Sequence, residues 1–362
     1  MLRNIQALRA AAALLVVVVH LEVQGTPLGL GRGFFDPFAV GVDLFFVISG
    51  FIMVHTTSRR YVSPGAFFVN RIVRIAPLYW FLTLIVFALA LAVPAVLGTT
   101  RADWPALARS LAFIPYERAD GTMRPLLFVG WSLNLEMAFY MLFAFALTVS
   151  GAGRRVAFGI GLLVLAVTAH FVLGARLSGA LRFLTQPILL EFAAGMAIGW
   201  IYPRLPGSRR AGRWAVMTGG LGLLALVVVA RWPLPGGWPI SLPPACVVVL
   251  AALVAEKAGR VIVWRPVQVL GDASYALYLT HPFVTQSWTL AAMKAGLVTS
   301  HTAPLLMVGT TACAAAVGIG VHYRVERPLG RLAQQVVVRM ACVRTGTLSP
   351  WQARATKWRT SK

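Results

Sequence analysis

Arg9 and His20 bound the first apolar stretch of the chain, in which every residue between them is alanine, leucine or valine. An ionisable side chain inside a membrane helix costs about 2.5–3.5 kcal/mol on insertion scales, so such residues usually serve a function. Their spacing of eleven residues is close to three helical turns. It places them roughly 20° apart around the helix axis and about 16 Å apart along it. One helix edge therefore carries a cation near one membrane surface and a titratable imidazole near the other.

Two carboxylates are predicted to lie near this imidazole. Asp43 begins the second apolar stretch, Glu136 lies in the fourth, and both stretches are predicted to enter the membrane from the side of His20. A carboxylate beside an imidazole can fix its tautomer and support its charged form. We therefore predict His20, Glu136 and Asp43 as catalytic residues. Two structural alternatives stay open: Asp43 merely begins a helix near the headgroups, and Glu136 forms a Glu–His or Glu–Arg pair that joins helices.

A pair of arginines, Arg71 and Arg74, precedes the third apolar stretch on the predicted inner side. They are three residues apart and so share one face of a helix, which Pro77 is predicted to kink at the membrane boundary. Two guanidinium groups side by side suit a phosphate or pyrophosphate group. Anchoring of the topology is the alternative, but Arg74 lies amid apolar residues where an anchor has no need to be.

The fourth apolar stretch opens at Trp131 and carries Ser132, Glu136 and Tyr140 at intervals of four residues. This spacing places the last three on one polar stripe of an otherwise apolar helix. A carboxylate at this depth needs a partner or a water-filled cavity. The stripe is therefore predicted to face a site inside the bundle.

In the ninth stretch Ser274, Tyr278 and His281 share a helix face, and Pro282 is predicted to break the helix directly after the histidine. A buried histidine that is simply hydrogen-bonded is the alternative for His281. Glu326 lies among arginines near the end of the tenth stretch, where it either balances their charge or shapes a phosphate pocket. The remaining histidines show no usable spacing: His55, His170, His301 and His322.

The composition is that of a polytopic membrane protein. Of 362 residues, 58% are hydrophobic and 12% charged, and the mean hydropathy is +0.76. The net charge of +22 would suit nucleic acid or anionic lipid. Because the arginines punctuate apolar runs, the composition favours lipid and excludes nucleic acid. The three cysteines have no metal-ligand spacing, so no metal is expected.

Apolar windows of about 20 residues predict an all-α fold of ten transmembrane helices. Most of the 33 basic residues fall on one set of alternate loops, which predicts both termini as cytoplasmic. The first stretch is interpreted as a retained span, not a cleaved signal peptide. The longest outer loop, 98–127, is either a recognition element or a simple connector. The predicted spans are 5–23, 39–57, 76–97, 128–149, 156–174, 187–202, 213–231, 240–256, 270–292 and 303–323.

Six blocks in this order resemble the membrane acyltransferase family 3. They begin at Leu8 with Arg9 and His20, at Gly41, at Phe68, at Trp131, at Leu270 and at Glu326, and they cover the chain from about residue 3 to 330. The opening from Asn4 to Arg9 resembles most the exopolysaccharide-acetylating branch. We divide the chain into a transmembrane acyltransferase domain, 1–332, and a basic cytoplasmic tail, 333–362, expected to lie on anionic lipid.

The resemblance implies a ten-helix enzyme of the bacterial inner membrane. Such enzymes move an acyl group, usually acetyl, from cytoplasmic acyl-coenzyme A to a sugar hydroxyl of a surface or exported glycan. The family's functional residues correspond here to Arg9, His20, Arg71 and Arg74, so the three arginines are expected to bind the donor. Some relatives carry a further periplasmic domain, and here the whole activity is expected in the membrane body. The resemblance also implies polysaccharide synthesis or export machinery as a partner.

Two other functions fit the same residues. Ionisable groups on both sides of a bundle also suit a proton-coupled transporter of an anionic or phosphorylated solute. A non-catalytic partner of a polysaccharide-export machine would tolerate replacement of His20. Within the enzyme hypothesis, His20 acts either as general base on the sugar hydroxyl or as a transient acyl carrier.

Overall fold

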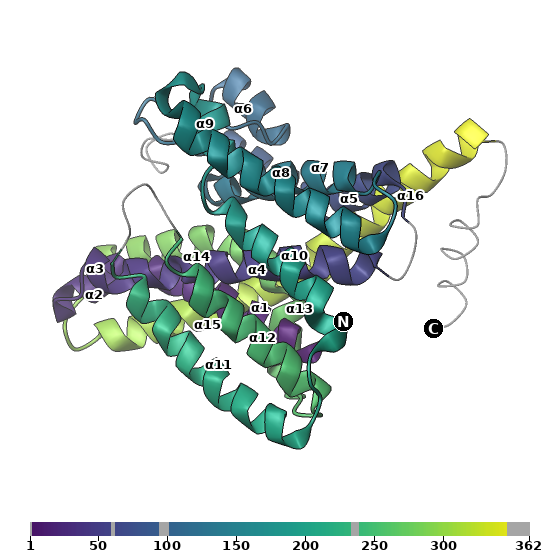
Figure 1. Ribbon diagram of the computed structural model, residues 1–362. Coiled ribbons are helices and arrows are strands. Elements are labelled where there is room, and N and C mark those ends of the chain that lie inside the picture. Colours follow the sequence, from purple (N-terminus) through teal and green to yellow (C-terminus); the bar gives the residue numbers. More distant parts are fainter. Residues whose placement is uncertain (1, 59–61, 94–100, 233–238, 346–362) are drawn as a thin grey trace.

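The computed structural model describes residues 2–58, 62–93, 101–232 and 239–345, and this part of the chain contains helices and no strand. The predicted all-α class is confirmed. Each of the ten predicted windows holds one main helix (Figure 1). These helices are α1 (Arg3–Val19), α4 (Val40–Thr57), α5 (Pro64–Ala92), α7 (Trp131–Ala146), α8 (Ala152–Leu173), α10 (Leu189–Ile201), α11 (Arg209–Val229), α12 (Leu242–Lys257), α14 (Ser274–Lys294) and α15 (Ala303–Val321).

Shorter elements join the main helices. They are α2 (Glu22–Gly25), η1 (Thr26–Leu28), α3 (Arg32–Phe35), η2 (Asp36–Ala39), α6 (Trp104–Leu111), η4 (Phe128–Gly130), η5 (Gly174–Arg176), α9 (Gly179–Leu184), η6 (Tyr202–Arg204), α13 (Arg265–Asp272), the π-helical turn η8 (His322–Glu326) and α16 (Arg327–Thr345). Figure 1 shows α16 toward the end of the bundle at which α1 begins, and α2 and α3 toward the opposite end.

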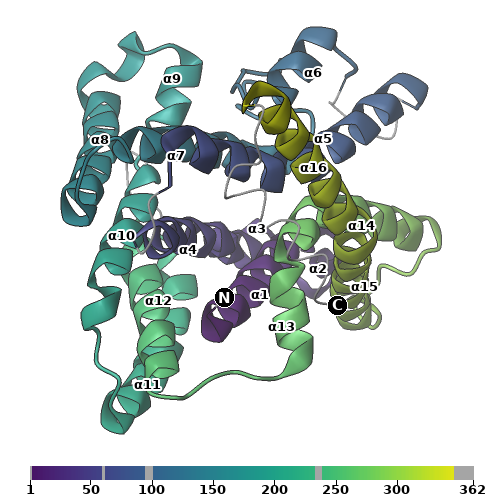
Figure 2. The same ribbon diagram turned by 90° about the vertical axis from the view of Figure 1, so that its right-hand side faces the viewer.

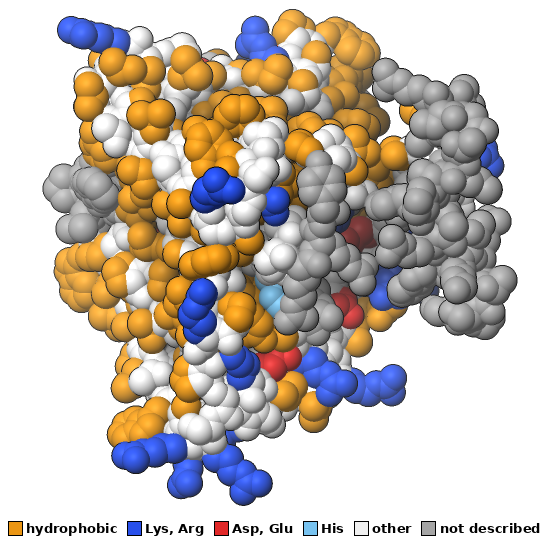
Figure 3. All heavy atoms as spheres, turned by 45° about the vertical axis from the view of Figure 1, so that its right-hand side comes forward, with side chains coloured by type: hydrophobic (Ala, Val, Ile, Leu, Met, Phe, Trp, Pro, Cys, Tyr) orange, Lys and Arg blue, Asp and Glu red, His pale blue; other side chains and the backbone are white. Residues whose placement is uncertain are grey.

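Seven helical stretches in the described part are long and apolar enough to cross a membrane, and an eighth is the pair of Arg3–Val19 with Glu22–Leu28, bent by 63°. A multi-pass membrane protein is therefore shown, whereas the count of ten spans stays a prediction. Large apolar side chains stand exposed on the flanks of α8, α11 and α15, as expected for surfaces that face lipid. Figure 3 shows such side chains over much of the visible surface.

The first helix lies at the centre of the bundle, where it packs against α4, α12, α13, α14 and α15 (Figure 2). Its alanines permit close approach of neighbouring backbones: a Cβ on Gly41 of α4 would lie 2.3 Å from the carbonyl oxygen of Ala12. The Glu256 carboxylate accepts hydrogen bonds from the backbone N–H groups of Arg3 and Asn4, at 2.8 and 2.9 Å. This carboxylate holds the start of the helix, where unpaired N–H groups attract negative charge.

Glycines also set the crossing of α4 with α10. A Cβ on Gly50 would lie 2.1 Å from the carbonyl oxygen of Phe192, and one on Gly195 would lie 2.1 Å from that of Val47. The two backbones are thus in direct contact, which fixes how α4 is rotated about its own axis.

The third main helix extends beyond its predicted membrane span and begins at Pro64, so Arg71 and Arg74 lie on a helix as expected. Ser63 caps this helix by accepting a hydrogen bond from the N–H of Ala66, and proline suits the first helical position. The break predicted at Pro282 is absent, since α14 continues through this proline to Lys294. Neighbouring helices make a proline tolerable in a membrane helix. The chain instead interrupts its helix at Ala273, between α13 and α14.

The predicted tail does not begin as a separate segment. Residues from 333 to 345 continue α16, which packs against α5. The rest of the predicted tail, 346–362, lies outside the described residues, as do 98–100 of the longest outer loop.

Candidate active site

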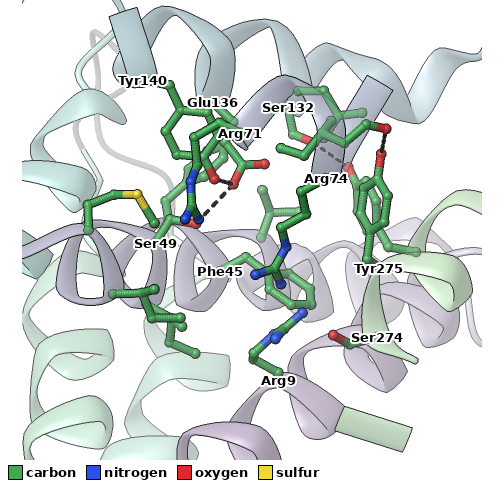
Figure 4. Close-up of a pocket in the computed structure, with 18 residues that line it drawn as sticks. Arg9, Phe45, Ser49, Arg71, Arg74, Ser132, Glu136, Tyr140, Ser274 and Tyr275 are labelled. Atoms are coloured by element: carbon green, nitrogen blue, oxygen red, sulfur yellow. Dashed lines mark hydrogen bonds between the residues drawn. The ribbon is translucent and has the colours of Figure 1, made fainter. Parts of the chain in front are cut away.

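A cavity of about 80 Å³ lies between α1, α4, α5, α7 and α14 (Figure 4). Space of this size holds several water molecules or a small polar group. Eight of the predicted site residues line it: Arg9, Arg71, Arg74, Ser132, Glu136, Tyr140, Ser274 and Tyr278. The structure therefore brings together residues from four separate sequence blocks.

Arg9 and Arg74 approach each other in this cavity. Figure 4 shows their guanidinium groups pointing toward one another from α1 and α5. Arg9 is buried, with 7% of its surface exposed, and its Nη1 donates a hydrogen bond to Gln6 Oε1 at 3.1 Å. Arg74 is exposed and makes no side-chain hydrogen bond within the described residues. Two like charges at close range repel, and an anion between them would remove that cost.

Arg71 lies one helical turn before Arg74 on the same cavity wall. Its guanidinium carbon lies 5.5 Å from the ring centre of Phe67 and 6.0 Å from that of Tyr140. These aromatic faces stabilise the cation and limit its rotamers. The Arg71 Nε atom is buried without a hydrogen-bond partner in the described part of the chain. It is therefore a donor available to a ligand.

Sequence patterns missed the support behind Arg9. Gln6 Nε2 donates to Asp272 Oδ1, so a carboxylate on α13 orients the amide that holds Arg9. A Cβ on Gly271 would lie 2.2 Å from the carbonyl oxygen of Gln6, which shows how closely α13 approaches α1. The available signal was the i, i+3 spacing of Gln6 and Arg9, together with the neighbouring residues Gly271 and Asp272.

Glu136 is the only carboxylate among the residues that line this cavity. Its Oε1 accepts hydrogen bonds from Ser49 Oγ, at 3.1 Å, and from the Tyr140 hydroxyl. The predicted pairing of Glu136 with His20 is wrong, because Glu136 lies too deep. Phe128, which contacts His20, precedes Glu136 by eight residues, and eight helical residues span about 12 Å.

Tyrosine and serine side chains frame the rest of the cavity. The hydroxyls of Ser132 and Tyr278 lie 2.7 Å apart, and Tyr278 also donates to the carbonyl oxygen of Val129 at 2.9 Å. The Tyr275 hydroxyl donates to the carbonyl oxygen of Ile75 at 2.7 Å and so joins α14 to α5. The Ser132–Tyr278 contact thus places the first residue of the polar stripe of α7 against α14.

His20 lies beyond the end of α1, away from the arginine cavity. Its Nδ1 lies 2.9 Å from the carbonyl oxygen of Val16. A carbonyl can only accept, so Nδ1 carries the proton and Nε2 is left as a basic lone pair. The ring lies 5.6 Å from that of Phe128 and 4.8 Å from that of His281, centre to centre.

His281 is fully buried beside His20. Neither of its ring nitrogens makes a hydrogen bond of normal geometry within the described residues. Ser274 and Tyr278 are predicted to share a helix face with His281, and both line the arginine cavity. His281 instead contacts the ring of His20. The face of α14 therefore connects both regions, and the two histidines form an imidazole pair.

Asp43 lies elsewhere. It is adjacent to Glu191 of α10 and to Ser241, on a different face of α4 from Ser49. The predicted placement of Asp43 beside His20 is wrong, because the close contact of α4 with α10 turns this side chain toward α10.

Glu326 pairs with a neighbouring histidine, and Trp131 packs in the apolar core. Glu326 Oε2 lies 2.7 Å from Nδ1 of His322 within η8, so a histidine without usable sequence spacing is the partner of this carboxylate. Glu326 is also close enough to Arg9 for the two opposite charges to attract each other. Trp131 begins α7 and packs against the apolar core, and it does not line the arginine cavity.

The described helices, the basic cavity and the imidazole pair fit a membrane-bound transferase. Comparison with protein families shows which kind of transferase this is. Residues 2–319 match the Acyltransferase domain family, acyltransferase 3. The chain belongs to this family, and the predicted acyltransferase activity is confirmed at that level.

Named relatives agree with this membership. The exopolysaccharide production protein ExoZ of Rhizobium meliloti is 36% identical over 299 residues, which cover 81% of this chain and 90% of ExoZ. The putative membrane-bound transacylase BcsY of Komagataeibacter xylinus is 28% identical, over 77% of this chain and 72% of its own. The O-acetyltransferase OatA of Staphylococcus aureus is 23% identical over 77% of this chain, which spans 50% of OatA. No solved structure matches significantly.

Proposed function

We propose that this protein is an integral membrane O-acyltransferase that moves an acyl group, with acetyl the favoured one, from cytoplasmic acyl-coenzyme A to a hydroxyl of a cell-surface or exported polysaccharide. The observation that carries the donor assignment is the convergence of Arg9, Arg71 and Arg74 on one cavity that holds a single carboxylate, Glu136. The polysaccharide acceptor is supported by the name of ExoZ, an exopolysaccharide production protein, and acetyl transfer to oxygen by the name of OatA, an O-acetyltransferase.

The arginine cavity would bind the phosphates of the nucleotide end of coenzyme A. Guanidinium groups form planar, charge-assisted hydrogen bonds to phosphate. The guanidinium of Arg74 and the Nε–H of Arg71 are donors without a partner in the described residues, so both can bind the phosphates. Glu136 acts here as a positioning residue, because it holds Tyr140, whose ring lies against Arg71. Bound phosphate would also separate Arg9 from Arg74.

The acyl end of the donor would lie at the imidazole pair. Arg9 and His20 are on the same helix edge, about 16 Å apart, a span that the long pantetheine arm of coenzyme A can bridge. His20 Nε2 is free to take a proton because Nδ1–H is bound to Val16. Binding and chemistry would therefore occupy opposite ends of α1.

Two routes use this nitrogen. In direct transfer, Nε2 removes the proton of the sugar hydroxyl, whose oxygen attacks the thioester carbon. The carbon–sulfur bond breaks, and the coenzyme A thiolate takes the proton from the imidazolium. In the covalent route, Nε2 itself attacks the thioester carbon, the carbon–sulfur bond breaks and coenzyme A leaves as the thiolate. The sugar oxygen then attacks the acyl carbon, the bond to Nε2 breaks, and the hydroxyl proton passes to the thiolate.

Bacterial inner-membrane localisation with cytoplasmic termini is part of the proposal and rests on the distribution of arginine and lysine between alternate loops. A reporter fused after Lys362 should be active in the cytoplasm, and one inserted at Asp120 should be active in the periplasm. Activity of both reporters on the same side would contradict the proposed entry of the donor.

The decisive experiment is acetyl transfer by the purified protein in liposomes. Radiolabelled acetyl-coenzyme A is supplied together with oligosaccharides prepared from the host's own exopolysaccharide. We expect coenzyme A release that depends on the oligosaccharide, with label appearing in the sugar. Label on the protein in the absence of sugar, chased into sugar on its addition, identifies the covalent route.

Uptake of the labelled compound into the liposomes without any coenzyme A release would contradict the proposal and support a transporter. The matched control is His301→Ala, which replaces an exposed histidine of the α14–α15 connection. It should transfer at the wild-type rate, whereas His20→Ala should not.

A further inference from the structure

A second and larger cavity, of about 610 Å³, lies between the 112–127 segment and the helices α8 and α9. Figures 1 and 2 show α9 beside one end of α8. The volume lies within the range of about 300–1,000 Å³ typical of small-molecule sites. None of the predicted catalytic or donor-binding residues lines it.

The wall of this second cavity carries hydrogen-bonding groups of both kinds. Arg182 and Gln186 supply donors, Glu117 supplies an acceptor, and the side chains of these three make no hydrogen bond within the described residues. His170 adds a further group. Its Nδ1 lies 3.1 Å from the carbonyl oxygen of Arg182, so Nδ1 carries the proton and Nε2 is an acceptor.

Aromatic side chains complete the wall. Phe171, at the end of α8, and Phe183, in α9, both line the cavity. A sugar presents hydroxyl groups that donate and accept, and carbon–hydrogen faces that pack on aromatic rings. One carboxylate and one guanidinium among the four polar side chains leave the wall near electrical balance, which suits hydroxyl groups better than a phosphate.

The same chain segment connects this cavity to the catalytic histidine. Met123 lines the cavity, and Phe128, five residues later, contacts the His20 ring. Arg124 lies between Met123 and Phe128 in the sequence. It is close enough to His20 for its positive charge to disfavour a protonated imidazole. A ligand held against this segment would therefore lie on the approach to the imidazole pair.

Hydrogen bonds hold this segment in place. Ser110 Oγ accepts from the N–H of Leu126 at 3.1 Å and lies 3.2 Å from the Tyr116 hydroxyl. Burial raises the pKa of the Tyr116 phenol, so it stays protonated and can donate in that contact. Leu126 and Leu127 are buried, which fixes the segment against the core. A cavity wall held in this way is preorganised for its ligand.

We propose that this cavity binds the saccharide acceptor and that Arg182 and Gln186 are specificity-determining contacts to it. The inference rests on the proposed acyl transfer to a glycan and adds to it the place where the glycan binds. Acceptor sugars would enter between α9 and the 112–127 segment, and a hydroxyl of the bound chain would extend along Met123–Phe128 to His20 Nε2.

The test is acceptor kinetics of an Arg182→Ala/Gln186→Ala variant with oligosaccharides of the host's exopolysaccharide. We expect the KM for the oligosaccharide to rise at least about tenfold, because two contacts to hydroxyl groups are lost. The kcat and the affinity for coenzyme A should change less than about twofold. The fold should survive, since Arg182 and Gln186 make their hydrogen bonds within the described residues through the backbone, which the variant keeps.

Arg176→Ala is the matched control, because Arg176 belongs to η5 beside the cavity and does not line it. Its KM for the oligosaccharide should equal that of the wild type. An unchanged KM in the double variant, in a protein whose wild type transfers acetyl, would overturn this inference and leave the proposed function standing. Absence of acetyl transfer by the wild type would instead count against the proposed function.

A second acceptor form, the same oligosaccharide on a polyprenyl pyrophosphate, tests what the cavity recognises. The KM should rise for both forms, because both carry the sugar. A rise confined to the lipid-linked form would show that Arg182 contacts the pyrophosphate and would contradict saccharide recognition.

Discussion

The two ends of α1 differ in what surrounds their ionisable residue. Arg9 is held by Gln6, which is in turn held by Asp272, and two further arginines from α5 face the same cavity. Within the described part of the chain, His20 has one hydrogen bond, to its own helix, and its ring contacts the rings of Phe128 and His281. One end is thus cationic and oriented by a network of polar side chains, and the other is aromatic with a free basic nitrogen.

This difference separates two tasks that a soluble transferase often combines in one cleft. Fixed guanidinium groups bind an anion strongly but cannot accept a proton at neutral pH. A neutral imidazole accepts a proton but binds phosphate weakly. Placing them about 16 Å apart on one rigid helix allows donor binding and group transfer to fail independently, and the following variants test this separation.

The largest effect is expected from His20→Ala. Loss of the general base or acyl carrier should reduce acetyl transfer by roughly 10²–10⁴-fold, while the melting temperature and coenzyme A affinity stay near wild type. All three quantities should be measured on the same preparation. Transfer at the wild-type rate would exclude His20 from the chemistry, and a joint loss of binding and stability would make it a structural residue.

The second largest effect is expected from Arg74→Ala, on donor binding at the Arg9 end of α1. Loss of charge-assisted hydrogen bonds to phosphate, each worth about 1.5–3 kcal/mol, should weaken coenzyme A binding roughly 10- to 100-fold. Lysine at this position should restore little, since it lacks the planar fork. The measurement is equilibrium binding, with Arg209→Ala, an exposed arginine at the start of α11, as the control. Unchanged affinity in an Arg71→Ala/Arg74→Ala protein would leave both as topology anchors.

Glu136→Gln should have an intermediate effect. The amide keeps an acceptor for Ser49 and Tyr140 but removes the negative charge from the cavity. We expect a loss of about tenfold or less in kcat/KM, with donor affinity unchanged or slightly tighter. A loss as large as that of His20→Ala would contradict the separation of the two regions and support a direct role of Glu136 at the imidazole.

The smallest effect is expected from Asp43→Asn. Asp43 lies against Glu191 and Ser241, outside both regions, and asparagine can keep a hydrogen bond there. Transfer should stay within about threefold of wild type, with any change appearing in thermal stability. Rates of acetyl transfer and melting curves check this together. A catalytic defect with unchanged stability would place Asp43 in the mechanism after all.

Much of the local structure follows from the sequence alone. Apolar windows locate each main helix, because a helix lets a single segment pair its backbone hydrogen bonds within itself inside the membrane. Within one helix the 3.6-residue period places Ser132, Glu136 and Tyr140 on a single stripe, and Arg71 with Arg74 on another. These residues indeed face one cavity. The family membership is likewise carried by ordered sequence blocks.

Only the tertiary structure decided which faces meet. Ser49 follows Asp43 by six residues, roughly 240° around the helix, so α4 can direct only one of them into the arginine cavity. The contact of Gly50 and Gly195 sets that rotation in favour of Ser49. The sequence pattern also leaves open how deep each side chain lies in the bundle. In the structure His281 contacts His20, whereas Glu136 is hydrogen-bonded to Tyr140. Helix periodicity is a property of one segment, whereas rotation and relative depth depend on the backbone contacts between segments.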